Sequence, residues 1–288
     1  IAQHILVCAT LCFSLLSCDV HQWPEAPIPN VDVNLSLTFD TDMPILAIID
    51  RMNTYASTDP EDYDIRYRIN AYRISDNGSV STKPSQSWTF SRPDIATLDI
   101  DKSIVMAPGK YRLHAWVDYV DNNSLEDKFY FTEEFTGISL LGNKHIGNND
   151  FRDAFTGWTD VEIIRYGGNH APVSATIQMY RPLSKIVFIT TDLEDWITKV
   201  LVNRQEIKEQ SGSSVSRPQS SKVNLEDYMV KVHYPQYMPN AFNLATDRTA
   251  WSDVNVKFNS QLIKLSDTEA AMGFDYVFAT ENDPKVVM

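Results

Sequence analysis

The sequence feature that most limits the fold is a period-two alternation of apolar and polar residues along the chain. Residues 31–39 alternate Val, Leu and Phe with Asp, Asn, Ser and Thr, and residues 110–120 repeat the pattern after Pro108-Gly109. Successive side chains of a strand point to opposite faces, so this pattern predicts half-buried β-strands. Further strands are predicted at residues 65–74, 87–90, 96–100, 174–180, 184–190, 230–234, 254–258 and 274–278.

Helices are predicted at two places only. Asp192 is a good N-cap and Asp195 falls at the third helical position, so residues 193–200 are expected to form about two turns of helix. The polar, glycine-rich stretch 142–157 is expected to hold a short helical turn within residues 150–155. Many short strands with few helices predict an all-β chain of two tandem antiparallel β-sandwiches, spanning residues 31–172 and 173–288.

The N-terminus has the composition of an export signal. Residues 1–17 contain no Asp, Glu, Lys or Arg, and residues 5–16 form an apolar run. A membrane-spanning helix needs about 20 apolar residues, so this run fits the core of a signal peptide better than a membrane span. Both chain ends are expected to be truncated, because Ile1 is not preceded by a basic segment and residues 285–288 begin a strand without its partner.

The apolar run ends at Leu15-Leu16-Ser17-Cys18, which resembles the cleavage sequence of bacterial lipoprotein signal peptides. This resemblance implies cleavage between Ser17 and Cys18 and acyl chains such as palmitate on Cys18, which would hold the protein on a membrane. The alternative is an ordinary cleaved secretory signal in which Cys18 is incidental. Residues 18–30 contain three prolines and are interpreted as a tether between the lipid and the folded body.

Cysteine usage and charge exclude several classes of function. The three cysteines are Cys8, Cys12 and Cys18, so a chain cut before Cys18 has no disulfide, no cysteine–metal site and no catalytic thiolate. The net charge of −13 lies entirely after residue 17. An acidic surface without a Lys/Arg cluster argues against nucleic acid as a partner.

The sequence contains no recognisable catalytic motif. The zinc-protease His-Glu-x-x-His, the phosphate-binding glycine loop and the Gly-x-Ser-x-Gly elbow are all absent. His114 lies on a predicted strand, where a solvent-facing or satisfied residue is expected, and the other histidines after the signal peptide show no metal-ligand spacing: His21, His145, His170 and His233. No catalytic residue and no cofactor are predicted.

Two weaker binding hypotheses come from the composition of single segments. Asp118, Asp121 and Asp127 are weak calcium candidates in an oxygen-rich loop, although the loop lacks EF-hand spacing and a plain polar loop is preferred. Exposed tryptophans could stack on sugars, but a core role is preferred for four that have apolar neighbours in the sequence: Trp116, Trp158, Trp196 and Trp251.

Three segments resemble the fimbrillin-type proteins of Bacteroidales, which are the pilins and minor-fimbrium anchor lipoproteins of the type V pilus. They are residues 107–116 (APGKYRLHAW), 181–188 (RPLSKIVF) and 234–243 (YPQYMPNAFN). The resemblance implies two transthyretin-like β-sandwiches in a non-enzymatic outer-membrane lipoprotein that faces the exterior and has a structural or adhesive role in fimbria-like assemblies. It leaves open whether the chain is a pilin, an anchor or a tip subunit.

The same resemblance implies fimbrial subunits as partners. In pilins of this type a protease trims the N-terminal strand, and a partner's strand fills the groove by β-strand addition. Arg51 lies in the region where such cleavage would occur, but nothing local marks it, so the role is not assigned to it. The alternative function is a glycan-binding outer-membrane lipoprotein that assists oligosaccharide uptake.

Overall fold

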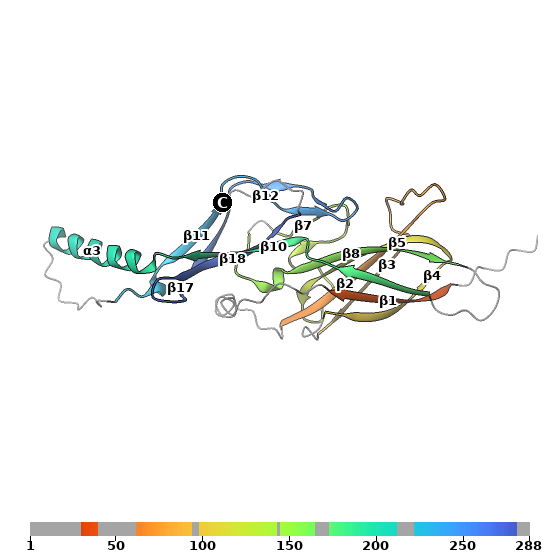
Figure 1. Cartoon of the computed structure of the whole chain (residues 1–288), viewed down its shortest axis with the longest axis horizontal. Helices are drawn as coiled ribbons and strands as arrows, with labels where there is room; N and C mark the ends of the chain where they lie inside the picture. The colour runs from red at the N-terminus through yellow and green to blue at the C-terminus, as the bar shows by residue number, and fades with distance from the viewer. Residues whose placement is uncertain are drawn as a thin grey trace, which may run out of the picture.

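The computed structural model describes residues 30–39, 62–93, 98–142, 145–164, 173–211 and 222–280. Within these residues the chain is built from β-strands in several sheets together with one α-helix (Figure 1). The all-β class predicted from the period-two patterns is confirmed. The predicted signal peptide, nearly all of the tether and the end of the chain from residue 281 lie outside the described residues, and so do Ser17, Cys18, His21, Arg51 and His170.

The first unit is a sandwich of two sheets. One sheet has the strand order β4-β1-β9, from β4 (Ile100–Met106), β1 (Val31–Phe39) and β9 (Val173–Met179). The other has the order β3-β2-β5-β8, from β3 (Gln86–Arg92), β2 (Tyr63–Arg73), β5 (Gly109–Asp121) and β8 (Ala154–Ile163). The apolar faces of the two sheets form one core, in which Val33, Ile65 and Leu113 are fully buried.

The second unit is built from smaller sheets. Its longest strands are β10 (Leu183–Thr190) and β18 (Ala270–Phe278), which pair with each other. The short strand β17 (Ile263–Lys264) pairs with the other edge of β18. Two strand pairs accompany them, β11 (Met229–Tyr234) with β16 (Val256–Gln261) and β12 (Met238–Pro239) with β15 (Ser252–Asp253). A four-stranded sheet has the order β14 (Arg248–Thr249), β13 (Ala241–Asn243), β7 (Ile138–Leu140) and β6 (Tyr130–Phe131).

The boundary between the units does not follow the predicted division at residues 172 and 173. β9 pairs in parallel with β1 and buries Ala175, Ile177 and Met179 in the first core. Conversely, β7 precedes this division in the sequence but pairs with β13 of the second unit, and β6 pairs with β7. We therefore place the passage between the units at Arg181-Pro182, just before β10. The local pattern showed that residues 173–179 form a strand, whereas its partner is set by contacts far away in the sequence.

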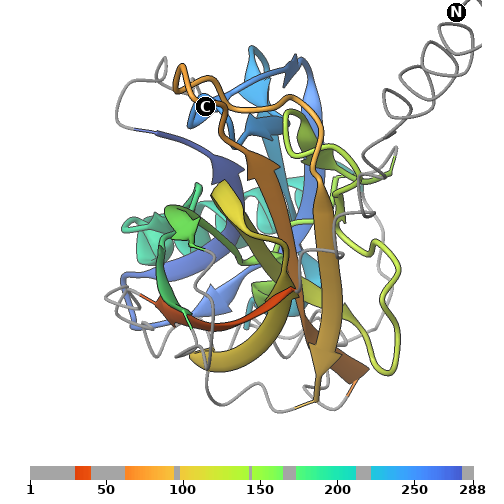
Figure 2. The ribbon, with the colours of Figure 1, turned by 90° about the vertical axis from the view of Figure 1, so that its right-hand side faces the viewer.

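The β2–β5 layer is buried on both of its faces. Tyr67 and Leu113 point into the first core, whereas Tyr72 and Trp116 belong to a second core shared with Phe274 of the C-terminal unit. Seen end-on from the side of the first sandwich (Figure 2), the C-terminal unit lies behind this layer. The polar alternation of residues 110–120 therefore does not mark a solvent-exposed face, because a second unit covers it.

Helix α3 (Leu193–Ser211) begins where predicted but continues well beyond the expected residue 200, and it projects from the end of the molecule opposite the first sandwich (Figure 1). Among the described residues, no helix has the length and apolar character required to span a membrane. The described residues also form two short 3-10 helices, η2 (Asp150–Arg152) and η3 (Leu225–Asp227). The helical turn predicted within residues 150–155 is thus present as η2.

Strands β8 and β4 differ from the predicted strands, whereas the turn at residues 76–78 agrees with its prediction. β8 was missed because its sequence begins within the glycine-rich stretch, yet Gly157 is required there: a Cβ would lie 2.4 Å from the carbonyl oxygen of Gln178 on β9. β4 starts at Ile100, where the predicted strand was expected to end. The sequence Asp76-Asn77-Gly78 predicts a hairpin turn, because Asn-Gly is typical of such turns. The structure confirms it, since Ser75 N–H donates to the Ser79 carbonyl (2.9 Å) and Gly78 has φ +83°.

Candidate functional site

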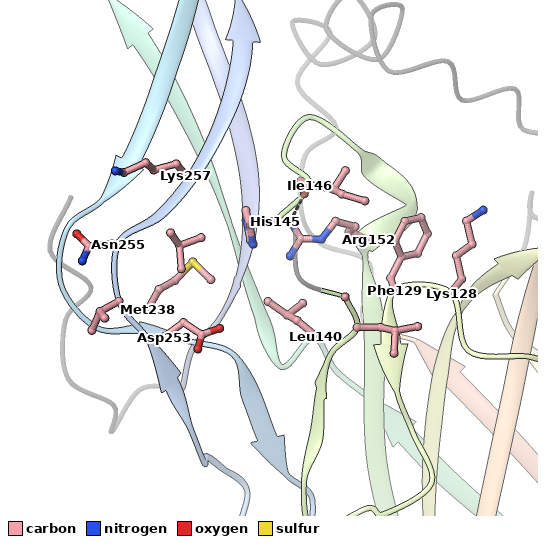
Figure 3. Close-up of a pocket in the computed structure, with 14 residues that line it drawn as sticks. Lys128, Phe129, Leu140, His145, Ile146, Arg152, Met238, Asp253, Asn255 and Lys257 are labelled. Carbon is pink, nitrogen blue, oxygen red and sulfur yellow. Dashed lines mark hydrogen bonds between the residues drawn. The ribbon is translucent and has the colours of Figure 1, made fainter.

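The candidate site is a cavity of about 560 Å³ in the second unit. In Figure 3 the side chains of β12, β15 and β16 lie on one side of it, and those between Lys128 and Arg152 lie on the other. Its volume falls within the range of roughly 300–1,000 Å³ that is usual for small-ligand pockets. Aliphatic side chains form part of its wall: Leu140, Leu141, Ile146, Met238, Val254 and Val256.

A buried ionic cluster, here called the floor cluster, lies next to the cavity and contributes His145 and Arg152 to its lining. Oδ1 of Asp275 in β18 accepts a hydrogen bond from Arg152 Nη1 (2.6 Å), and Oδ2 accepts one from Tyr234 Oη (3.0 Å). His145 Nε2 lies 2.7 Å from the same Oδ2. Arg152 also donates to the carbonyl oxygens of Ile146 and Tyr276. Burial by itself would raise the pKa of Asp275, but Arg152, His145 and Tyr234 together hold it below its ordinary value.

The charged groups of this cluster are paired with each other. The guanidinium of Arg152 and the carboxylate of Asp275 neutralise each other, with side chains 4% and 0% exposed. Asp253 is the only carboxylate among the described residues that line the cavity. Hydrolysis of a glycosidic bond requires two carboxyl groups, one on each side of the bond. The described lining residues therefore do not supply the pair of carboxyl groups that this reaction requires.

The mouth of the cavity combines apolar and basic side chains. Leu141, Ile146 and Val254 are 43%, 47% and 54% exposed, which is unusual for residues of this type gathered at one place. Lys128 and Lys257 flank them on opposite sides (Figure 3). A ligand with an apolar body and polar or anionic ends would match this distribution.

The calcium candidates have other partners in the structure. Asp118 is fully buried and binds Arg66 through two hydrogen bonds of 2.9 and 2.7 Å. Asp127 accepts hydrogen bonds from Arg66 (2.8 Å) and from the Thr132 hydroxyl (2.7 Å), and Asp121 binds Lys128. Among the described residues, no group of three or more metal-binding side chains converges. Calcium binding at these aspartates stays an untested hypothesis.

The pKa of Asp127 is lowered by its hydrogen-bond partners. Burial opposes the charged form, but hydrogen bonds from Thr132 and Arg66 hold the pKa of Asp127 below its ordinary value. The Arg66 cluster joins β2, β5 and the segment before β6, so its role in the fold is to tie this segment to the sheet.

The histidines divide between the cavity and the sheet. His145 joins the floor cluster, although 130 residues separate it from Asp275. No spacing in the sequence connects the two, so sequence reasoning could not have found this pair. His114 is buried between the units instead of facing solvent, and burial lowers its pKa to about 4. His233 lies on an outward position of β11.

The tryptophans differ in a way that bears on binding. Trp116 is fully buried, as expected for a core residue, whereas Trp158 and Trp251 are 46% and 59% exposed and the core role expected for them is wrong. The Trp251 ring lies over Gly137, where a Cβ would come within 2.7 Å of it. The Arg112 guanidinium lies over the Trp158 ring, 4.1 Å from its centroid. Trp196, the fourth, packs edge-on against Tyr228.

The fold and the cavity define a two-unit β-sheet protein with a surface site suited to binding. Comparison with protein-family models shows that the chain belongs to a family described as "Family of unknown function (DUF6562)", which matches residues 27–288. No curated protein matches the sequence.

Several solved structures are similar to the chain at low sequence identity. The fimbrial anchor protein Mfa2 from Porphyromonas gingivalis is 12% identical, with 88% of this chain and 75% of Mfa2 covered at a TM-score of 0.44. The tip fimbrial protein Mfa3 from the same organism is 10% identical, with coverages of 88% and 71% and a TM-score of 0.41. A candidate polysaccharide-binding protein from Bacteroides thetaiotaomicron is 11% identical, with coverages of 87% and 73% and a TM-score of 0.45.

Proposed function

We propose that the chain is a non-enzymatic lipoprotein of the cell surface, with a structural or adhesive role in a fimbria-like assembly. The observation that carries this proposal is the place of β1 in the fold. Residues 19–30 alone separate the lipidation sequence at Cys18 from β1, and β1 is the central strand of its sheet. Lipid on Cys18 would thus be attached through a short tether to the central strand of a sheet.

The cavity supports a role in binding. Its wall combines aliphatic and polar side chains, Lys128 and Lys257 lie at its mouth, and Arg152 is paired with Asp275. Pockets of this kind bind a ligand by burying apolar surface and use a few polar groups to orient it. A protein held on the outer membrane and facing outward would present this cavity to other envelope components.

Association with fimbrial subunits by β-strand addition has a structural basis in the second unit. Within the described part of the chain, β10 is an edge strand of its sheet, paired only with β18. Ile186, Val187 and Phe188 follow one another on this strand and are only partly buried. An edge strand of this kind offers main-chain hydrogen-bonding groups to a partner strand.

Metabolic labelling tests the lipid anchor. Cells that express the full-length precursor are grown with radiolabelled palmitate, and the protein is recovered with an antibody. The wild type and the control variant Cys12→Ser should both take up label, whereas Cys18→Ser should not. Equal labelling of the Cys18→Ser variant would rule out this anchor.

Surface assembly needs a separate experiment. Protease added to intact cells should degrade the protein, and membrane extracts should contain SDS-resistant oligomers that include it. Full protection from protease in intact cells, together with purely monomeric protein in extracts, would contradict a fimbrial role.

The second candidate is a glycan-binding lipoprotein that assists oligosaccharide uptake, which the exposed tryptophans favour. The outer end of the Trp251 ring lies next to Gly137, and the residue is 59% exposed, so its ring is accessible to a sugar. A glycan array decides between the candidates. Saturable binding that Trp251→Ala abolishes and Trp158→Ala retains would favour glycan binding over the fimbrial role.

A further inference from the structure

The two ends of strand β1 are connected to different parts of the protein. Its Val31 end follows the tether from Cys18, which is the lipid-bearing residue if the proposed function is correct. Its other end lies beside the end of β9, since Phe39 is paired with Met179. The chain leaves β9 there and enters the C-terminal unit through β10. The tether and the C-terminal unit are thus joined to opposite ends of the β1–β9 ladder, along the long axis of the molecule (Figure 1).

From this geometry we infer that β1 is a load-bearing clamp, which carries tension between the membrane anchor and the C-terminal unit in shear. A pull on the tether acts along the axis of β1, parallel to its ladders. All seven residue pairs with β9 and all seven with β4 are then loaded together. A pull across a ladder would instead break its pairs one after another, starting at one end.

The side chains of β1 prevent it from sliding under this load. Val33, Leu35 and Leu37 are at most 1% exposed and face the core, while Asp32 and Asn34 face outward. Because the side-chain period of a strand is two, a slip by one residue would place the polar set in the core and the apolar set in solvent. A permitted register therefore requires a slip of two residues, with all the pairs broken at once.

Polar contacts on the outer face hold the same register. Ser36 Oγ donates to Asp101 of the segment paired with β1 on one side (2.5 Å), and Thr38 Oγ1 donates to Gln178 of β9 on the other (2.9 Å). At the far end, the backbone N–H of Phe39 donates to the Asp99 carboxylate (3.0 Å). These bonds connect β1 to both of its neighbours, so tension is shared between β4 and β9.

Single-molecule force spectroscopy tests the clamp on the soluble chain from residue 19 onward, which contains no cysteine. One variant carries handles at Asn30→Cys and Thr176→Cys, which pull β1 along its ladder with β9. The matched variant carries handles at Asn30→Cys and Val105→Cys. Val105 is 47% exposed and paired with Asp32, so this pull peels β1 from β4 at one end.

The shear variant should rupture at a several-fold higher force than the peel variant at the same loading rate. Both should unfold at the same urea concentration, because the replaced side chains are exposed. Equal rupture forces would overturn the clamp and leave the lipid anchor intact. Absence of palmitate on Cys18 would instead overturn the anchoring role, whatever the forces measured.

Discussion

The buried histidine of β5 leads to a quantitative prediction about pH. His114 is 6% exposed, its ring lies 5.5 Å from the ring of Tyr72, and its Nδ1 has no hydrogen-bond partner within the described part of the chain. Burial, assisted by the positive charge of Arg112, lowers its pKa to about 4, although Asp160 and Asp247 oppose the shift. The folded protein therefore keeps this histidine neutral at a pH where the unfolded chain protonates it.

The sign of the effect follows from proton binding. The pKa of a histidine in an unfolded chain is about 6.5, so between pH 6.5 and 4 the unfolded state binds a proton that the folded state does not. The contribution of neutral His114 to stability is complete above pH 6.5 and is lost as the pH falls toward 4. Between pH 7 and pH 5 the loss amounts to about 2 kcal/mol in the free energy of unfolding.

Urea unfolding followed by tryptophan fluorescence at pH 7, 6 and 5 measures this loss. The comparison is between the wild type and His114→Phe, which keeps an aromatic ring but cannot titrate. The two proteins must be compared because burial raises the pKa of Asp153 to about 6. This carboxyl titrates in the same pH range as His114, and its effect on the free energy of unfolding has the opposite sign. The variant should therefore lose about 2 kcal/mol less than the wild type between pH 7 and pH 5.

The exposed His233 provides the control, since His233→Phe removes a histidine without changing the interior. Parallel pH profiles for the wild type and His114→Phe would refute the reasoning, because they would show that His114 is protonated to the same extent in the folded and unfolded states.

Three further predictions concern buried charge and close packing. Arg66→Met leaves Asp118 buried without its cation and should lower the free energy of unfolding by about 3–5 kcal/mol, whereas Lys110→Met, which removes an exposed pair with Glu162, should cost at most about 1 kcal/mol. Urea midpoints at constant m-value measure both, and equal costs would contradict the role of burial. Asp275→Asn should cost about 3 kcal/mol at pH 7. Because the folded-state pKa of Asp275 is lowered, its contribution is present above about pH 4 and is lost as the pH falls further, so the cost should shrink in acid; a cost independent of pH would speak against this. Gly157→Ala places a methyl group against the Gln178 carbonyl and should cost about 1–3 kcal/mol in thermal or urea unfolding; an unchanged midpoint would contradict the close approach of β8 and β9.

Local patterns in the sequence were sufficient for much of the secondary structure. β1, β5 and the hairpin turn before β3 were predicted because alternation and turn residues act over a few neighbouring positions. The start of α3 was predicted from its N-cap, but its length was not, since the residues after Val200 have no strong apolar stripe to mark a helix.

The candidate site could not be predicted in the same way. The cavity joins residues near position 130, position 145 and position 255, and its floor depends on a contact between His145 and Asp275. Spacing within the sequence carries no information about such pairs. The exposure of Trp251 was also hidden, because apolar neighbours in the sequence do not show on which side of the chain a ring between the short strands β14 and β15 will lie.

By itself, the sequence determined that this chain forms β-strands and that residues 19–288, which contain no cysteine, have no disulfide, and it predicts a lipid-attachment site shortly before the first strand. Only the tertiary structure decided that β1 lies between β4 and β9, that the β2–β5 layer is buried on both faces, and that a cavity opens beside Asp275. The physical reason is the distance along the sequence over which each effect acts. Alternation reports which residues share a face, whereas the partner of each face is chosen by burial among strands that are distant in the sequence.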